Sequence, residues 1–147
     1  MKDFPLDRDV HRQYYDEITT KLKRDPFAKR LGIRLTSIGE GTATAEVTVD
    51  ETMLNVHGTV HGAVIFALAD VVFAVASNSY GRTAVALSMN IGYMAASFAG
   101  ERLKATAVEE KKNHRTSWYR IKVENEKEIL AIVDALAYRK KDYFVQI

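Results

Sequence analysis

The stretch Gly62-Ala-Val-Ile-Phe-Ala-Leu-Ala-Asp70-Val-Val-Phe-Ala-Val-Ala sets one carboxylate in the middle of an otherwise apolar segment. A helix that is apolar on all sides is a buried helix, so the sequence predicts a long central helix over residues 59–79, ending before Gly81. Acidic side chains are rarely buried without a partner. Asp70 is therefore either satisfied by a local partner or retained for chemistry.

The segments on either side of this helix predict an α+β fold. Residues 9–22 carry an apolar side chain at every fourth position and predict one amphipathic helix, and Asp25-Pro26 predicts the start of a short second helix that ends near Gly32. Alternation predicts strands at residues 33–38, 42–49, 83–94, 102–111, 117–124 and 128–140. Short connections favour antiparallel neighbours, and we expect a curved antiparallel meander wrapped around the helix.

Length and composition fit one domain with a hydrophobic core. The 147 residues are 47% hydrophobic and 27% charged, which is ordinary for a soluble globular protein. We divide the chain into an N-terminal helical segment, residues 1–30, and a main body, residues 31–147. Because the outer face and the edges of a single wrapped sheet need cover, this pattern predicts an oligomer.

Charge and residue types exclude several function classes. A net charge of +2 with scattered Lys and Arg argues against nucleic-acid binding. The chain has no cysteine, which excludes disulfides and thiol nucleophiles, and it lacks a Gly-x-Ser-x-Gly elbow and a Walker A loop. The charged N-terminus does not read as a signal peptide, and the apolar run is short for a membrane span and has an acid at its centre. We expect a cytoplasmic protein that binds neither nucleic acid nor membrane.

The loop before the helix, Asn55-Val-His57-Gly58-Thr-Val-His61-Gly62, is a second candidate feature. The first turn of a helix has free N–H groups and a partial positive charge, so Gly62 can hold a developing oxyanion. The alternative is a loop that merely starts a helix. Gly58 between the two histidines argues against a metal pair, and we expect no metal. His61 then fixes the loop through a hydrogen bond, with Asn55 as one partner.

Gly62 and Asp70 lie eight residues apart on one helix. At ~1.5 Å per residue, they are separated by about 12 Å. One substrate carbonyl cannot be served by both groups of the same chain. If both act on one substrate, they come from two copies, which predicts an active site at a homodimer interface.

Ser88 and Asn90 are further candidates, on the strand that follows the helix. A period of two places them on one face with Ala86 and Gly92, which we take as an inner face where they can orient a water. The alternative is that they are ordinary polar residues. We interpret a set of basic residues as surface charges, with contacts to the phosphates of a cofactor-like ligand as the alternative. These residues are Arg82, Lys111, Lys112, Arg115, Lys140 and Lys141.

Several short motifs can be read together: Leu54-Asn55, His57-Gly58, His61-Gly62, Leu68-Ala69-Asp70, Ser77-Asn-Ser-Tyr-Gly81 and Phe98-Ala-Gly-Glu101. Together they resemble the signature of hotdog-fold acyl-CoA thioesterases of the phenylacetic-acid-degradation (phenylacetyl-CoA thioesterase) type. The resemblance implies a hotdog domain over residues 31–147, in which an antiparallel sheet wraps a central helix. It also implies homodimers that pair into a homotetramer, with active sites between subunits.

The resemblance implies a role for each of these residues. The acid matching Asp70 acts as general base or nucleophile on the thioester of an acyl-CoA substrate. The amide matching Gly62, from the facing subunit, polarises the carbonyl, while Asn55 supports the loop or the carbonyl and His61 positions it. A polar residue at or near Ser88 or Asn90 holds the water.

Coenzyme A enters as part of the substrate, and no metal or redox cofactor is required. Its phosphates are expected at the basic residues, namely Arg82, Lys111, Lys112 and Arg115. Two departures from the family pattern bear on acyl specificity: Ala63 replaces a second glycine, and residues 94–98 lack a proline.

Two other functions stay open. A hydratase or dehydratase of acyl thioesters needs a proton shuttle, for which His61 and Asp70 are the only nearby pair. A non-catalytic acyl-CoA-binding module would use Asp70 as a structural acid with a local partner.

Overall fold

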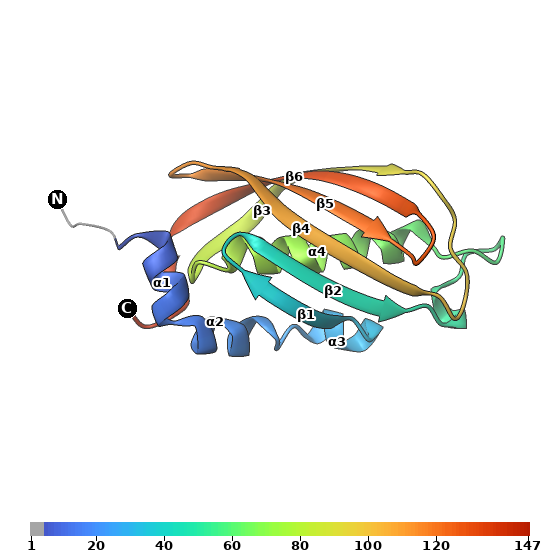
Figure 1. Ribbon diagram of the computed structural model, residues 1–147, viewed down its shortest axis with the longest axis horizontal. Coiled ribbons are helices and arrows are strands. Elements are labelled where there is room, and N and C mark those ends of the chain that lie inside the picture. The colour runs from blue at the N-terminus through green and yellow to red at the C-terminus, as the bar shows by residue number, and fades with distance from the viewer. Residues whose placement is uncertain (1–4) are drawn as a thin grey trace.

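A six-stranded antiparallel sheet wraps around one long helix in the computed structural model, which describes residues 5–147 (Figure 1). In chain order the elements are α1 (Asp7–Gln13), α2 (Tyr15–Leu22), α3 (Pro26–Leu31), β1 (Arg34–Gly39), β2 (Thr42–Thr48), the 3₁₀ turn η1 (Glu51–Met53), α4 (Gly62–Asn78), β3 (Arg82–Tyr93), β4 (Arg102–Lys112), β5 (Thr116–Glu124) and β6 (Ile129–Tyr143). The expected α+β architecture and all six strands are confirmed.

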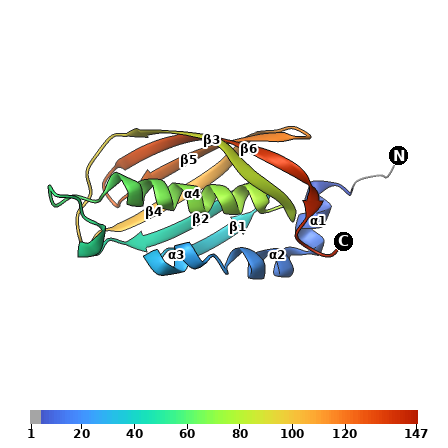
Figure 2. The same ribbon diagram turned by 180° about the vertical axis from the view of Figure 1, so that it is seen from behind.

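The sheet order is β1-β2-β4-β5-β6-β3, so the prediction of a simple meander is wrong for β3. Strands β4, β5 and β6 do form a meander, but β3 pairs with β6 and not with β4. Residues 94–101 make the crossover, and they are long enough to pass over the end of the sheet. As a result β3 is an edge strand that runs beside α4 (Figure 2).

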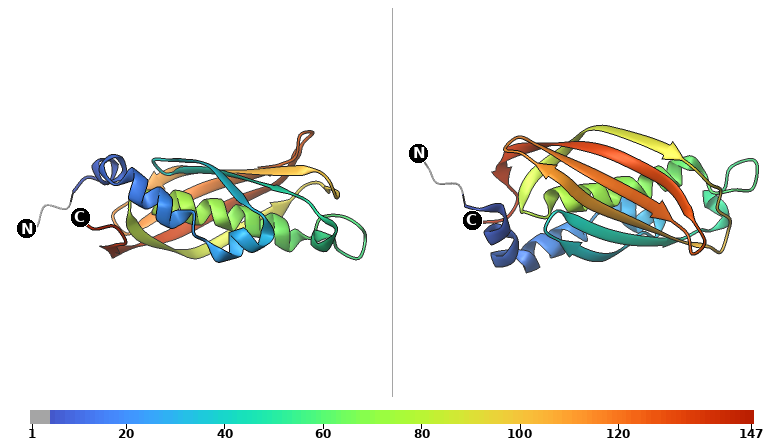
Figure 3. Two further views of the ribbon diagram at one scale, coloured as in Figure 1. Left: turned by 90° about the horizontal axis from the view of Figure 1, so that it is seen from below. Right: turned by 45° about the horizontal axis from the view of Figure 1, so that its top comes forward.

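Helix α4 lies inside the curve of the sheet (Figure 3). The strand positions beneath it are occupied largely by fully buried alanines, which let the helix backbone approach the sheet closely. They include Ala43, Ala45, Ala105, Ala107, Ala131, Ala135 and Ala137. The large, fully buried side chains of this core come from both layers: Phe73 and Leu68 from the helix, and Tyr119, Leu103, Ile121 and Leu130 from the strands.

The expectation that the helix is buried on every side is wrong for one stripe. Phe66, Asp70, Ala74 and Asn78 are spaced four residues apart and are half-buried or exposed. Residues with this spacing lie on one face of a helix. The carboxylate therefore sits on a stripe of α4 that the described chain leaves partly uncovered.

The N-terminal helices differ from the expected single helix over residues 9–22. Tyr14 leaves helical geometry and separates α1 from α2. The break lets Val10 and Ile18 bury in the same small cluster with Val145 near the C-terminus. The start of α3 is as expected, since the Asp25 side chain accepts hydrogen bonds from two N–H groups of its first turn.

Candidate active site

Asp70 has no hydrogen bond or ion pair within residues 5–147. Burial raises the pKa of its carboxyl above the ordinary value, and the negative charge of Asp25 on the α2–α3 turn raises it further. No local partner therefore offsets the partial desolvation of this carboxylate. A purely structural role would require such a partner, so the geometry favours a role in binding or chemistry.

The N-terminus of α4 leaves one backbone donor unused. The Ala63 N–H donates to Nδ1 of His61 at 3.0 Å, and the N–H groups of Val64 and Ile65 donate to the His61 carbonyl. The Gly62 N–H has no acceptor among the described residues. It is thus available to a negatively charged ligand atom at the positive end of the helix dipole.

His61 caps the helix, and the hydrogen bond that we expected between its ring and Asn55 does not form in the described chain. Because Nδ1 accepts the Ala63 N–H, the proton of the neutral ring sits on Nε2. Ala63 has ordinary helical geometry, since no residue other than glycine has a positive φ in the described chain. The missing second glycine therefore introduces no backbone strain.

Tyr93 holds the same helix end and was not identified from the sequence. Its hydroxyl donates to the Gly62 carbonyl at 3.0 Å. A Cβ on Gly62 would lie 3.2–3.3 Å from the Tyr93 ring. Glycine is thus favoured at position 62 because the Tyr93 ring leaves little room for a Cβ. The only sequence signal was the place of Tyr93 at the end of a strand with alternating faces.

Asn55 stabilises the loop that precedes α4 through hydrogen bonds of its side chain. Its side-chain oxygen accepts the N–H groups of His57 and Thr59, and its amide donates to the Thr59 hydroxyl. Gly58 completes the turn with a φ of 80°. Of the two roles implied for Asn55, the geometry favours support of the loop. Val56 at its tip is 96% exposed, and the loop projects from the body (Figure 2).

Ser88 and Asn90 lie on the outer face of the sheet, so the inner-face prediction is wrong. They stand opposite Leu136 and Asp134, whereas Ala86 stands opposite the buried Ala137. An irregularity between Ala86 and Ser88 causes the change. A bulge adds one residue and reverses the alternation beyond it. Both side chains therefore point away from α4 of their own chain.

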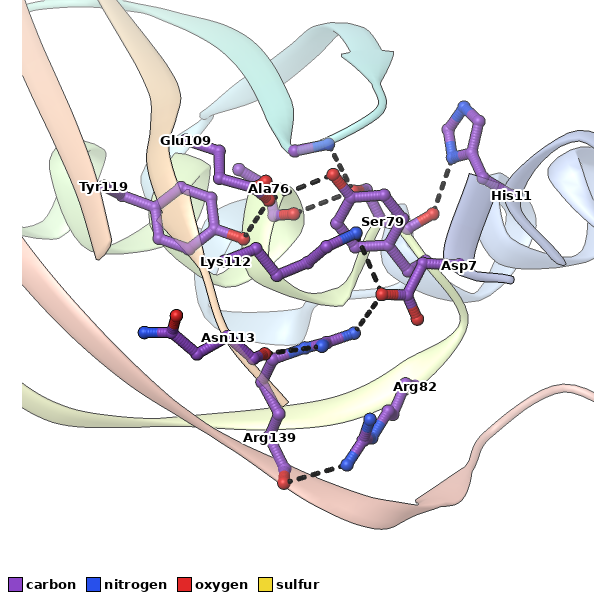
Figure 4. A network of polar contacts seen from close by, with 12 residues as sticks. Asp7, His11, Ala76, Ser79, Arg82, Glu109, Lys112, Asn113, Tyr119 and Arg139 are labelled. Atoms are coloured by element: carbon purple, nitrogen blue, oxygen red, sulfur yellow. Dashed lines mark hydrogen bonds and ion pairs between the residues drawn. The ribbon is translucent and has the colours of Figure 1, made fainter. Parts of the chain in front are cut away.

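Two of the four basic residues proposed for phosphates are engaged internally (Figure 4). The Arg82 guanidinium is buried and donates to the carbonyls of Arg139 and Lys140. Lys112 pairs with Asp7 at 2.8 Å. The interpretation as a surface charge is wrong for Arg82, whereas Lys112 is half-buried. Lys111, by contrast, is exposed, and Arg115 on the turn before β5 is half-buried.

A cavity with a volume of about 410 Å³ lies beside α4. Six of its ten lining residues are apolar, and the other four are Lys23, Lys29, Arg34 and Asp25, whose charge acts on Asp70. The apolar lining consists of Leu22, Ala28, Ile33, Leu35, Val71 and Val75. The cavity is therefore adjacent to the stripe that carries Asp70.

One chain brings Asn55, His61, Gly62 and Tyr93 together at the start of α4, but not Asp70. Eight helical residues separate Gly62 from Asp70, which corresponds to about 12 Å. The edge strand β3 exposes Val85 by 40% and Leu87 by 56%. An unpaired edge with apolar side chains is a surface that a second copy can cover.

A family model described as the thioesterase superfamily matches residues 57–132, which include the start of α4 and Asp70. The chain belongs to the thioesterase superfamily. Membership identifies it as an enzyme that hydrolyses thioesters and confirms the hotdog fold.

Similar thioesterases support this assignment. The acyl-coenzyme A thioesterase PaaI of Escherichia coli K12 is 41% identical over 106 residues, which cover 72% of this chain and 76% of that protein. The structure of the E. coli PaaI protein from the phenylacetic acid degradation operon superposes with a TM-score of 0.83. It is 34% identical and covers 92% of this chain and 97% of that one. A point mutant of the phenylacetic acid degradation protein PaaI from Thermus thermophilus gives a TM-score of 0.77 at 39% identity, with 79% and 100% covered.

Metal-binding clusters and membrane-spanning helices are both absent from the described part of the chain. No group of three or more His, Cys, Asp or Glu side chains is arranged to hold a metal ion between residues 5 and 147. In the same range, no helix is both long and apolar enough to span a membrane.

Proposed function

We propose that the protein is an acyl-CoA thioesterase whose active sites form between two copies of the chain. The observation that carries this proposal is a pair of unpartnered groups on α4. One is the Gly62 N–H at its start, and the other is the Asp70 carboxylate about 12 Å further along. The carboxylate supplies a base and the N–H supplies a donor for the oxyanion, and a hydrolytic site needs both.

In the proposed reaction, Asp70 accepts a proton from a water as the water oxygen bonds to the thioester carbon. The carbonyl oxygen becomes an oxyanion and accepts a hydrogen bond from the Gly62 N–H of the facing copy. Collapse of this intermediate breaks the C–S bond, and the thiolate of coenzyme A takes the proton. A carboxyl with a raised pKa is a stronger base, which supports this role, and direct nucleophilic attack by Asp70 is the alternative.

The dimer is proposed to form along the edge of β3. This edge exposes Val85 and Leu87, and its Ala84 backbone bonds to the side chain of Asn78, which lies on the same stripe of α4 as Asp70. Pairing there would cover the edge and bring the two helices together. A homotetramer would then use the outer face of the sheet, where Trp118 is 43% exposed.

We assign the acyl group to the 410 Å³ cavity beside α4, whose apolar walls suit an aryl group or a fatty chain. The similar proteins from phenylacetic acid degradation favour an aryl acyl group. Lys111 and Arg115 remain candidates for the coenzyme A phosphates. Ser88 and Asn90 are left out of the water site because they face away from α4. Location in the cytoplasm stays a prediction from sequence.

A hydratase reaction fits the geometry less well. It would need His61 and Asp70 to share a proton on one substrate. Nδ1 of His61 is occupied as the helix cap, and the two residues are separated by more than two helical turns.

The test is thiol release from a panel of aryl-CoA and fatty-acyl-CoA thioesters, comparing the wild type with Asp70→Asn. We expect release by the wild type, strongest with aryl-acetyl groups, and almost none by the variant. Equal rates in both proteins would rule out the role of Asp70, and no release on the whole panel would rule out the reaction. A change in enoyl-thioester absorbance without thiol release would assign the hydratase.

A further inference from the structure

We propose that a second site, for a phosphate group, lies at the far end of α4, in a cavity of about 270 Å³ between α1, β3, β6 and the turn joining β4 to β5. It is lined mainly by basic and polar side chains. These are Asp7, Arg82, Lys112, Asn113, His114, Arg139 and Tyr143, with Pro5 and Leu6 at the rim. This site does not depend on the reaction proposed above.

The cavity carries more positive than negative charge. Arg82, Lys112 and Arg139 contribute three cations, and Asp7 is the only carboxylate in the lining. Asp7 bonds to Lys112 at 2.8 Å and to Arg139 at 2.7 Å. Burial alone would raise the pKa of Asp7, but these two cations outweigh it and lower the pKa. Asp7 is therefore ionised and pairs directly with two of the three cations, and the third cation has no carboxylate partner in the lining.

Arg82 is that cation. Its side chain is 7% exposed, and its Nε and Nη2 groups donate only to backbone carbonyls. The Nη1 group has no acceptor within residues 5–147. Burial and the nearby charge of Arg139 lower the pKa of Arg82. Because the guanidinium lines the cavity and has no carboxylate bound to it, an anion in the cavity would accept hydrogen bonds from its remaining N–H groups.

The size and donors of the cavity match a phosphate group. Its volume lies just below the range of pockets for drug-sized ligands, so it suits a small ion or one end of a larger molecule. Guanidinium groups bind phosphate oxygens in a planar, bidentate manner. Figure 4 shows Arg82 and Arg139 on neighbouring strands, with Lys112 and the Asp7 carboxylate close to Arg139.

The site is remote from the Gly62 end of α4. The helix of 17 residues spans about 24 Å between its first and last Cα atoms. A phosphate there does not touch the reacting thioester of the same chain. The phosphate group has two sources, free inorganic phosphate and the phosphates of coenzyme A, and the experiment separates them.

The experiment is calorimetric titration of inorganic phosphate at constant ionic strength into the wild type, Arg82→Met and Arg120→Met. Arg120 is an exposed arginine on β5 that pairs with Asp134, and it serves as the matched control. We expect saturable binding by the wild type and the control, and affinity at least about tenfold weaker in Arg82→Met. Absence of binding by the wild type, or unchanged binding by a folded Arg82→Met, would overturn the proposal.

A second variant keeps the test valid if Arg82→Met does not fold. Asn113→Asp adds a carboxylate at the exposed rim of the cavity and should weaken phosphate binding while the fold is retained. Unchanged binding by this variant would also contradict the site.

Repeating the wild-type titration with saturating coenzyme A identifies the source of the phosphate group. Loss of phosphate binding assigns the site to the phosphates of coenzyme A, and simultaneous binding assigns it to free phosphate.

Discussion

The two ends of α4 differ in how their polar groups are used. At the start, the Gly62 N–H is unpaired among the described residues, and the loop before it projects from the body. Beyond the last turn, the hydroxyl of Ser79 is fully buried and bridges the Gly41 N–H and the Ala76 carbonyl (Figure 4). The Ser79 carbonyl lies 2.6 Å from Nδ1 of His11, which donates to it.

The same contrast extends to the residues around each end. Near the far end, the Glu109 carboxylate accepts hydrogen bonds from the hydroxyls of Tyr80 and Tyr119. Burial and the charge of Glu109 raise the pKa of both tyrosines, so they remain neutral donors. Asp70, midway along the helix, has no such donors within residues 5–147. The polar groups that are satisfied at the far end stabilise the fold, whereas the unpaired Gly62 N–H and Asp70 carboxylate are the groups that we assign to the active site.

The largest expected effect is on Asp70→Asn. We predict a fall in kcat of ~10²–10⁴-fold, because the general base is lost. Thermal stability should stay the same or rise, since a partly desolvated charge without a partner is removed. Thiol release and the melting temperature, measured on one preparation, test both parts. A large loss of stability would instead show that Asp70 has a structural role, as the polar groups at the far end of α4 do.

The next prediction distinguishes the role of the Gly62 N–H as a donor from the effect of crowding around Gly62. Gly62→Pro removes the donor, and proline is tolerated at the first position of a helix. Gly62→Ala keeps the donor and crowds Tyr93 in the same way, so it is the matched control. We predict that kcat of the proline variant lies ~10²–10³-fold below that of the alanine variant. Equal values would remove the oxyanion role.

At the far end, Ser79→Ala should act on stability alone. It leaves the buried Gly41 N–H without its acceptor, which costs about 1–3 kcal/mol. We predict a lower free energy of unfolding in denaturant titration and an unchanged kcat. A changed kcat with a retained fold would show that the two ends are coupled.

The smallest effect is on the pH dependence of stability. The folded pKa of Asp70 is raised, so its charge opposes folding at neutral pH, and this penalty disappears as pH falls through the raised value towards 3.8. The stability difference between Asp70→Asn and the wild type should therefore shrink in that range. Unfolding curves at several pH values measure it, and a constant difference would contradict the raised pKa.

Patterns carried by single segments were predictable from the sequence. The apolar run predicted α4, and the spacing of Gly62 and Asp70 predicted their separation of about 12 Å along it. Features that depend on pairing between segments were not predictable. The bulge that turns Ser88 outward is set by the register with β6, and the burial of Arg82 depends on contacts with that strand. The hydrogen bond of Tyr93 to Gly62 joins residues 31 positions apart.

The central claim is that one active site draws Asp70 from one copy and Gly62 from another. Hybrid dimers of Asp70→Asn and Gly62→Pro test it directly, because one of their two sites would hold both intact groups. With random mixing in equal amounts, about half of the dimers are hybrids, and we predict about one quarter of wild-type thiol release. Verified hybrids that release no more thiol than the parent variants would show that each site takes both groups from one chain.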